Sequence, residues 1–442
     1  MFLLFNKLFR KKSNVVNGVD YISNLPDPIL HLILSRLHST KEVVRTRVLS
    51  TRWRNLWTSI PSLEICETKP LSALQKNQFK EFVYWVLANR TLDLDSFTLD
   101  CGDHCDMSTI LRLIHVAVIR KVKQLDLTFC LRDTGEDFVL PRCLLDCDSL
   151  EVLKLDMFMC YLSLESFTGS KTLKVLVLDN VGLCDHDSVR SFLVYCPLLE
   201  EFSLIDCQTD DLDYLHISCP NLKTLRINNR GLGYYKERLC ERLMKAVIEL
   251  EDMEQKNEFD DNFGVTVCEL FFQVSHVEYL SINYLFVESI SSKCECFNCP
   301  KKGFPESLPS LKTLEITIDG YLLDVLLRIL KCSPNLDFLH LIFYKDISPD
   351  QYEAFVEELV EVETMKILTH HLKKVEFLEF NGERETLAIA QFLFEHGNAL
   401  EEIVFSWRNE DRYCKKSRKA MNEVSKFYKA SSVVKVITLL KD

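Results

Sequence analysis

Two groups of cysteines contain residue types that can bind a metal ion. Cys294, Cys296 and Cys299 place three thiols within six residues, and residues 101–105 hold two more cysteines and a histidine. Structural zinc takes four such ligands, usually supplied as two pairs at fixed spacing. Neither group is followed by a matching second half. We therefore predict ordinary cysteines in a reducing cell, with no metal and no other cofactor.

Catalytic chemistry has no evident candidates in the sequence. His370 and His371 are adjacent rather than spaced as in a zinc-binding helix, and there is no P-loop, GxGxxG or GxSxG motif. No two carboxylates can be assigned to opposite sides of a cleft, as general acid and base catalysis requires. We predict that the chain itself is not an enzyme.

Composition narrows the class of protein. The 442 residues are 47% hydrophobic and carry a net charge of −12, which is typical of a globular chain and not of a general nucleic-acid binder. The 18 cysteines follow no disulfide framework, so we expect the cytoplasm, the nucleus or both. Polar Asn6 and Lys7 interrupt the apolar start, so residues 1–19 are predicted to be a flexible leader, and no window is long enough to span a membrane.

Residues 20–60 predict a small helical domain. Asp27 can cap a helix whose first residue is Pro28, and Ser39 with Glu42 forms a capping-box pattern that starts a second helix. Apolar residues recur at helical spacing through both segments and include two tryptophans. A unit this short is too small to be an enzyme, and its apolar surface suggests binding to another protein.

The strings LPDPILHLILSRL and VVRTRVLSTRWRNLW closely resemble the plant-type F-box, with departures at Pro28 and His38. The resemblance implies docking on a Skp-family adaptor and, through it, on a cullin-RING ubiquitin ligase. The residues that it assigns to adaptor binding are Leu25, Pro26, Ile29, Leu30, Ile33, Leu34, Leu37, Val48, Leu49, Trp53, Leu56 and Trp57.

The rest of the chain repeats the pattern LxxLxL, whose alternation is typical of a strand with one buried face. Leu94/Phe97/Leu99 is the first unit, and successive units up to residue 222 start 23 to 28 residues apart. Helical patterns lie between units, for example at 110–117 and near 189–193. This is the period of leucine-rich repeats, which stack because no single repeat can bury its apolar face.

The predicted fold is α/β: a small all-α F-box domain, then an irregular leucine-rich-repeat α/β solenoid with a C-terminal cap. A helical linker is expected at 61–93 and the solenoid at 94–371, with an insertion near 228–276 that contains a helical pattern at 234–256. Residues 372–442 resemble the FBD region through LKKVEFLEFNGERE and ALEEIVF. Their units are assigned as Val375/Leu378/Phe380, Leu400/Ile403/Phe405 and Val434/Ile437/Leu439.

The function that these resemblances imply is substrate recognition for an SCF-type ubiquitin ligase, with the solenoid holding an unidentified protein substrate. A ligase-independent binding scaffold is a first alternative. A second, weaker alternative is a nucleic-acid or zinc-binding factor that uses a basic helix, at 45–54 or 408–419, and the cysteine cluster at 294–299. Outward-facing strand residues would contact the substrate: Lys154, Asp156, Asp179, Thr224, Arg226, Asn228, Tyr279, Asn283, Glu315, Phe338 and His340.

Overall fold

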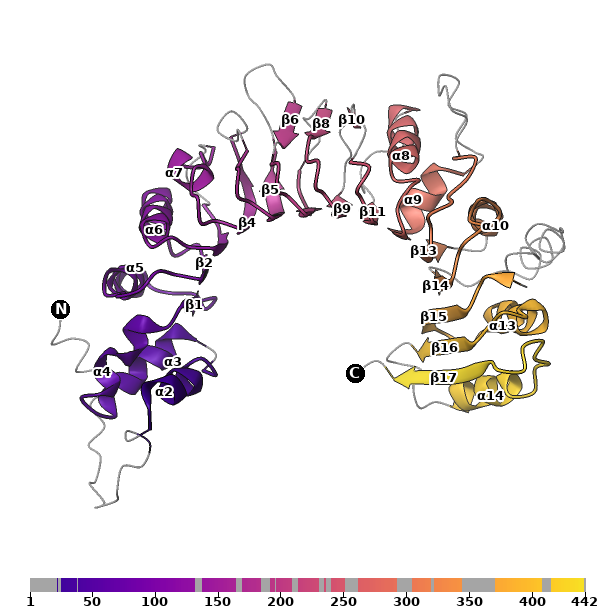
Figure 1. The fold of residues 1–442 in the computed structure, drawn as a ribbon, viewed down its shortest axis with the longest axis horizontal. Coiled ribbons are helices and arrows are strands. Elements are labelled where there is room, and N and C mark those ends of the chain that lie inside the picture. Colours follow the sequence, from indigo (N-terminus) through magenta and orange to yellow (C-terminus); the bar gives the residue numbers. More distant parts are fainter. Residues whose placement is uncertain are drawn as a thin grey trace.

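The computed structural model is an open arch, with a sheet on its inner face and helices on its outer face (Figure 1). The leader, Cys294, Cys296 and Cys299 lie outside the residues that the structure describes. These are 22, 25–37, 39–131, 137–163, 169–183, 191–194, 196–208, 214–229, 234–235, 240–250, 261–291, 304–318, 322–343, 370–407 and 415–440.

One parallel sheet of 14 strands runs through the arch in chain order, apart from three short strands that form a second sheet. The strands of the large sheet are β1 (Ser62–Cys66), β2 (Ser96–Gly102), β3 (Gln124–Phe129), β4 (Val152–Tyr161), β5 (Val175–Gly182), β7 (Glu201–Ile205), β9 (Thr224–Asn229), β11 (Lys245–Leu250), β12 (Tyr279–Ile282), β13 (Thr313–Ile318), β14 (Phe338–Phe343), β15 (Lys374–Phe380), β16 (Glu402–Trp407) and β17 (Lys435–Leu440). The small sheet contains β6 (Ser191–Val194), β8 (Tyr214–Ile217) and β10 (Tyr234–Tyr235).

The helices fall into two groups. Those of the N-terminal domain are α2 (Asp27–Leu34), α3 (Thr40–Arg45) and α4 (Trp53–Leu56), with 3₁₀ turns at Thr46–Val48 and Trp57–Ser59. Those on the convex side are α5 (Ala73–Ala88), α6 (Met107–Ile119), α7 (Arg142–Leu145), α8 (Asp261–Gln273), α9 (Tyr284–Ser289), α10 (Leu323–Cys332), α13 (Arg384–His396) and α14 (Lys415–Val424). At the crest of the arch the small sheet takes the place of helices (Figure 1).

The LxxLxL pattern is confirmed as the core-forming unit. From Leu94/Phe97/Leu99 to Leu336/Leu339/Leu341, the apolar residues of every predicted unit are at most 2% exposed. In β3, for example, burial alternates, and Leu125, Leu127 and Phe129 face inward. The alternate residues of each strand line the concave face. Stacking of neighbouring repeats therefore buries one continuous core, as the repeat period predicts.

The interval 228–276 is not simply an insertion, because it contains a further repeat. In its described residues, the helix predicted at 234–256 is wrong. β11 pairs in parallel with β9 and β12, and Leu243, Ala246 and Ile248 are its buried unit. Alanine in place of the middle leucine hides this unit from the pattern. The helix expected near 189–193 is likewise the strand β6.

The linker and the C-terminal units also differ from the prediction. Residues 61–93 contain the strand β1 as well as helix α5. In β15 the buried unit is Leu372/Val375/Phe377, which also fits the LxxLxL pattern and starts three residues before the predicted unit. Phe380 is buried as well, after a register shift beside Glu379, whose φ is 52°. In β17 the core-facing residues are Val436 and Thr438, which pair with Ile403 and Phe405. The predicted unit, Val434/Ile437/Leu439, was therefore one residue too late in the sequence.

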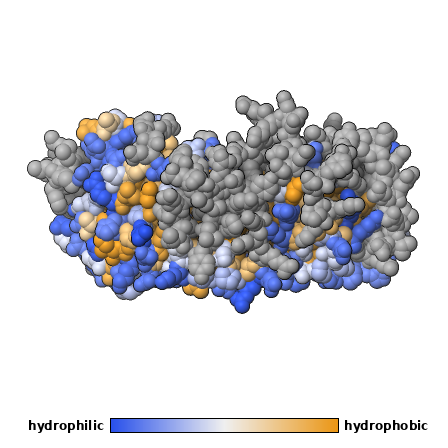
Figure 2. Space-filling view, turned by 90° about the horizontal axis from the view of Figure 1, so that it is seen from above, coloured by the Kyte–Doolittle hydropathy of each residue, from blue (hydrophilic) through white to orange (hydrophobic). Residues whose placement is uncertain are grey.

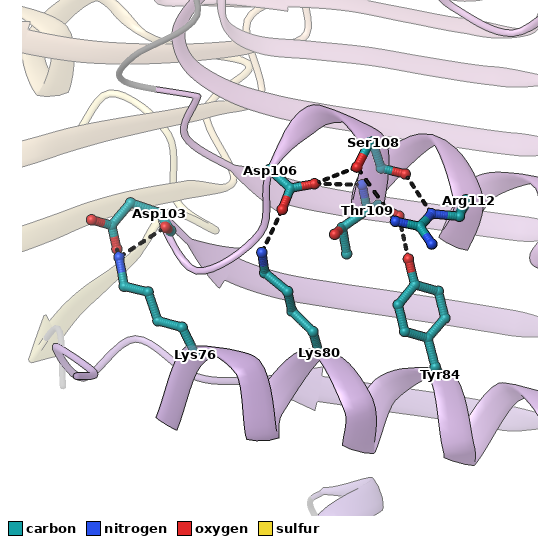
Figure 3. Close-up of polar contacts among 8 residues, drawn as sticks. All are labelled: Lys76, Lys80, Tyr84, Asp103, Asp106, Ser108, Thr109 and Arg112. Atoms are coloured by element: carbon teal, nitrogen blue, oxygen red, sulfur yellow. Dashed lines mark hydrogen bonds and ion pairs between the residues drawn. The ribbon is translucent and has the colours of Figure 1, made fainter. Parts of the chain in front are cut away.

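Helix α5 is fixed to the first repeats by two lysines (Figure 3). The Nζ of Lys76 lies 3.2 Å from Oδ1 of Asp103, and Lys80 pairs with Asp106. Asp106 also caps α6 by accepting the backbone N–H of Thr109 at 2.8 Å. The hydrogen bond from Lys80 lowers the pKa of Asp106, so this carboxylate stays ionised and connects both helices.

Candidate functional site

The N-terminal helical domain has its own apolar core. Leu30, Leu34, Trp53, Leu56 and Trp57 are all at most 8% exposed. These residues were predicted to contact an adaptor. In the free chain they form the core of the domain and hold its helices together, and their contact with an adaptor stays a prediction.

A second set of the predicted residues remains on the surface. Ile29 and Ile33 lie one turn apart on α2 and are 44% and 39% exposed, and Val48 and Leu49 are more exposed still. Pro26, immediately before α2, is exposed as well. Exposed apolar side chains gathered on one small domain are a mark of a protein-binding surface.

Three further residues refine this surface. Leu32, which the sequence analysis did not select, is 58% exposed, whereas Leu25 and Leu37 are half-buried against the core. The apolar stripe used for the prediction does not include Leu32, although it contains both buried and exposed residues of α2. We define the docking face as Pro26, Ile29, Leu32, Ile33, Val48 and Leu49.

An ion pair connects the two segments of the docking face. The Nε of Arg52 lies 3.2 Å from Oδ1 of Asp27 at the start of α2. Asp27 is the first residue of the helix, one residue earlier than predicted, and Pro26 precedes it. The ion pair therefore holds the start of α2 close to the chain that follows Val48 and Leu49. Ser39 caps α3 as predicted, by accepting the N–H of Glu42.

The domain is attached to the arch through a tryptophan pair. The rings of Trp57 and Trp85, on α5, are 4.9 Å apart, and the guanidinium of Arg47 lies 5.3 Å from the centre of the Trp85 ring. Buried Arg90 donates to the carbonyl of Trp57 at 2.9 Å, and burial, with nearby Arg120, lowers the pKa of Arg90 to about 10. This packing fixes the direction in which the docking face points relative to the arch.

Exposed apolar side chains also occur outside the helical domain. Leu74 on α5, Leu92 and Ile119 are each more than half exposed. From above, orange surface is interspersed with blue at the end of the molecule that holds the first repeats, on the left (Figure 2). A single exposed leucine is therefore common on the surface of this protein. The docking face differs because several exposed apolar side chains lie together in two adjoining segments.

The residues predicted to face a substrate lie on the strands as expected, with one exception. Lys154 and Asp156 are on β4, and Asp179 is on β5. Further along are Thr224, Arg226 and Asn228 on β9, Tyr279 on β12, Glu315 on β13, and Phe338 and His340 on β14. Asn283 instead caps α9, where its side chain accepts the N–H of Phe286, and it bonds the backbone of Leu250.

Towards the N-terminal end, the concave face is acidic. Burial raises the pKa of Asp126, Asp156 and Asp179, and the charge of Asp156 raises the pKa of both other carboxyls further. Asn180 relieves part of this repulsion by donating to Asp156 at 3.2 Å and to Asp179 at 3.0 Å.

Further along, the concave face carries polar pairs between neighbouring strands. Tyr279 donates to Glu315 at 2.7 Å, and burial together with this bond raises the pKa of the tyrosine. Arg226 and Asn228 both donate to Glu249, at 3.3 and 3.1 Å.

Two of the carboxylates that form these pairs were not predicted from the sequence. Glu249 lies on β11, the strand taken for a helix. Glu376, on β15, lies 3.2 Å from the Nδ1 of His340. A correct assignment of the strand starting at Lys245 would have placed Glu249 on this face.

The second cysteine group is packed rather than arranged around an ion. Cys101 and Cys105 are buried, and the hydrogen bond between the Cys101 thiol and Cys105, together with burial, raises the pKa of Cys101. The Nε2 of His104 lies 3.0 Å from the carbonyl of Lys69. Within the described ranges, no three potential ligands come together at a metal-sized site. The same ranges contain no helix that is both long and apolar enough to cross a membrane.

Comparison with known protein families gives the same order of domains as the sequence analysis. A profile of the F-box domain matches residues 22–64, and a profile of the FBD matches residues 363–405. Between them, the profile described as the leucine-rich repeats of the FBD-associated F-box protein At5g56370 matches residues 110–341, more than half of the chain.

Similar proteins from Arabidopsis thaliana match the sequence of this chain over different lengths. The chain is 35% identical to F-box/FBD/LRR-repeat protein At4g00160 over 49% of this chain and 48% of that one. It is 26% identical to F-box/FBD/LRR-repeat protein At1g78750 and to F-box/LRR-repeat protein 13, each over 95% of this chain and 96% of the other. The chain belongs to the plant F-box/FBD/leucine-rich-repeat protein family.

Proposed function

We propose that this protein is the substrate-recognition subunit of an SCF-type ubiquitin ligase. In this proposal the docking face binds a Skp-family adaptor, which connects the chain to a cullin-RING ligase, and the concave face binds the substrate protein. The F-box match at residues 22–64 supports the first part, and the exposed sheet face supports the second. The chain would be a non-catalytic subunit of the complex.

The observation that carries the proposal is the exposure of the docking face. The helical domain buries Leu30, Leu34 and Trp53 almost completely and yet leaves Ile29, Leu32 and Val48 open to solvent. Covering these side chains with a partner removes apolar surface from water at a gain of about 25 cal/mol per Å². Such exposure is unfavourable for a free domain and useful for one that docks.

The solenoid would then act by proximity. Because the tryptophan pair fixes the docking face relative to the arch, a substrate on the concave face is held in one direction from the ligase. Holding an acceptor lysine near the charged ubiquitin-conjugating enzyme raises its effective concentration, without chemistry from this chain. The described cysteines are all free thiols, and we propose the cytoplasm, the nucleus or both as the compartment.

Affinity capture of the full chain from plant cells tests this function. We expect the wild type to bring down a Skp-family adaptor and a cullin, and the variant Ile29→Asp/Ile33→Asp to lose both. Leu74→Asp, also at an exposed leucine but outside the docking face, is the matched control and should retain both. Equal recovery of adaptor and cullin by the wild type and the double variant would contradict the proposal.

The alternative, a binding scaffold without ligase function, requires a second measurement. Proteins captured by the wild type are incubated with the reconstituted ligase, ubiquitin and ATP. We expect at least one of them to be ubiquitylated, and to be ubiquitylated much more slowly when the docking-face variant replaces the wild type. Adaptor binding without any ubiquitylated protein would favour the scaffold.

A further inference from the structure

The two edge strands of the large sheet have different surroundings. At the N-terminal edge, α3 lies against β1, and the N–H of Glu64 donates to Oγ1 of Thr40 at 2.8 Å. At the C-terminal edge, β17 pairs only with β16, and among the described residues no element pairs with its other side (Figure 1). Within the described part of the chain, one edge strand is therefore covered and the other is open.

The open edge offers backbone groups for pairing. The N–H of Lys435 donates to the carbonyl of Glu401 at 2.8 Å, so this residue directs its backbone groups towards β16. Directions alternate along a strand, and Val436 and Thr438 consequently direct theirs to the free side. An unpaired row of this kind is a template for a further strand.

The apolar core is open at the same place. In β16 the core-facing Ile403 and Phe405 are fully buried, whereas their neighbour in β17, Val436, is only half-buried. Val433 and Tyr428, both before the strand, are 64% and 71% exposed, and Leu439, on the concave side of β17, is 46% exposed. The last repeat therefore lacks the neighbour that covers the apolar side chains of every other repeat.

The charge around the open edge is opposite to that of the whole chain. Residues 415–435 contain seven Lys or Arg and one Glu, a net charge of +6, in a chain of net charge −12. Arg418, Lys419, Lys426 and Lys435 are exposed. A partner that approaches this edge is therefore selected for negative charge.

We propose that an extended, acidic segment of another protein binds here as an additional strand beside β17. Its backbone pairs with the groups of Val436 and Thr438, its apolar side chains cover Val433 and Leu439, and its carboxylates face the basic residues. A second copy of this chain is a poor occupant, because two such edges repel each other. A nucleic acid would satisfy the charge but neither the unpaired backbone nor the exposed apolar side chains.

The test uses the full chain and fluorescent ten-residue peptides. A peptide of alternating Glu and Val is expected to bind. Alternating Lys and Val, with the opposite charge, is expected not to bind, and neither is the Glu and Val peptide with every backbone nitrogen methylated, which keeps the side chains and removes the backbone donors. On binding, the amides of Val436 and Thr438 should become protected from hydrogen exchange. Equal binding of the methylated peptide, or no binding of the unmethylated Glu and Val peptide, would overturn the proposal.

Two variants examine the two parts of the interaction separately. Thr438→Pro removes an N–H on the free side while keeping the bonds to β16, and should weaken binding about tenfold. Lys419→Glu/Lys426→Glu/Lys435→Glu, at three exposed lysines, should weaken binding by at least as much and abolish its salt dependence. This triple variant tests the proposal even if the proline variant does not fold. Lys69→Glu/Lys121→Glu/Lys171→Glu, at three exposed lysines elsewhere in the chain, changes the charge by the same amount and should bind as the wild type does.

A single-stranded oligonucleotide of ten thymidines completes the set of probes. It is expected to bind more weakly than the Glu and Val peptide. If it binds more tightly, and the triple variant abolishes that binding, the edge is a nucleic-acid surface and the proposed acidic strand is wrong.

Discussion

The Nζ of Lys123 lies 2.7 Å from Oδ1 of Asp95, which occupies the same position one repeat earlier, just before the strand. The same position carries alternating charges through most of the sheet, with Met244 as the interruption. In order, the residues are Asp95, Lys123, Glu151, Lys174, Glu200, Lys223, Met244, Glu278, Lys312, Asp337, Lys373 and Glu401. Each lysine pairs with the acid before it at 2.7 to 2.9 Å. We call this row the charge ladder.

The charge ladder should be sensitive to charge reversal. Lys174→Glu places three carboxylates side by side, because Glu151 and Glu200 lie in the adjacent repeats, whereas Lys174→Ala only removes one exposed ion pair. In urea unfolding at low salt, we expect a small decrease in stability for the alanine variant and a clearly larger one for the glutamate variant. The difference should shrink in 1 M salt. Equal midpoints at low salt would show that the ladder has no electrostatic role.

The junction between Trp57 and Trp85 should affect ubiquitylation more than adaptor binding. Trp85→Ala removes the ring contact and the cation–π contact with Arg47, which are worth about 1 kcal/mol each. The docking face stays intact, so adaptor affinity should stay within about twofold. Ubiquitylation of a captured substrate should fall, since its direction from the ligase is no longer fixed. Unchanged ubiquitylation, with binding also unchanged, would mean that the junction has no orienting role.

Two aspartates should respond to pH with opposite sign. The pKa of Asp106 is lowered in the folded protein, so its contribution is present at neutral pH and is lost as the pH falls below about 3.9, the ordinary aspartate value. The pKa of Asp126 is raised, so its ionised form opposes folding, and stability from this group increases as the pH falls towards that value. At pH 7, Asp106→Asn should therefore destabilise the protein and Asp126→Asn should stabilise it. The unfolding free energy of each variant is compared with that of the wild type at pH 7 and at pH 4. If both substitutions change it in the same direction, this assignment is refuted.

Gly382 is required for the C-terminal cap. Its φ is 67°, and an added Cβ would lie 3.0 Å from the Trp407 ring and 3.1 Å from the Cβ of Ala420. Gly382→Ala should cost roughly 1–2 kcal/mol from the backbone alone, plus the cost of displacing the tryptophan. Gly102→Ala is the control, because its φ is 48° but its Cβ would meet nothing within 4 Å. Thermal unfolding should show the larger loss for Gly382→Ala, and an equal loss would mean that crowding contributes nothing.

Much of the fold could be predicted from the sequence, because the repeated leucines report burial directly. The errors have local causes. Ala246 replaces the leucine that would have revealed β11, and β1 has only Leu63 and Ile65 as buried residues, too few to stand out beside the helical domain. In β15 two overlapping sets of residues, Leu372/Val375/Phe377 and Val375/Leu378/Phe380, fit the pattern, and the spacing alone does not choose between them.

The candidate site was predictable in its location but not in its exposed residues. Leu30 and Ile29 are adjacent and similar in hydrophobicity, yet one is fully buried and the other is 44% exposed. Which side of α2 faces α4 is decided by packing between helices. The spacing of apolar residues identifies a stripe, and it does not show which part of the stripe the domain uses for its own core.

The central claim is tested most directly by titrating the purified full chain with a purified plant Skp-family adaptor in a calorimeter. The account predicts one-to-one binding with a negative heat-capacity change, a loss of affinity of at least about a hundredfold for Ile29→Asp/Ile33→Asp, and unchanged affinity for Leu74→Asp. If the wild-type chain fails to bind the adaptor, or the double variant binds as tightly as the wild type, the docking face does not have the role assigned to it.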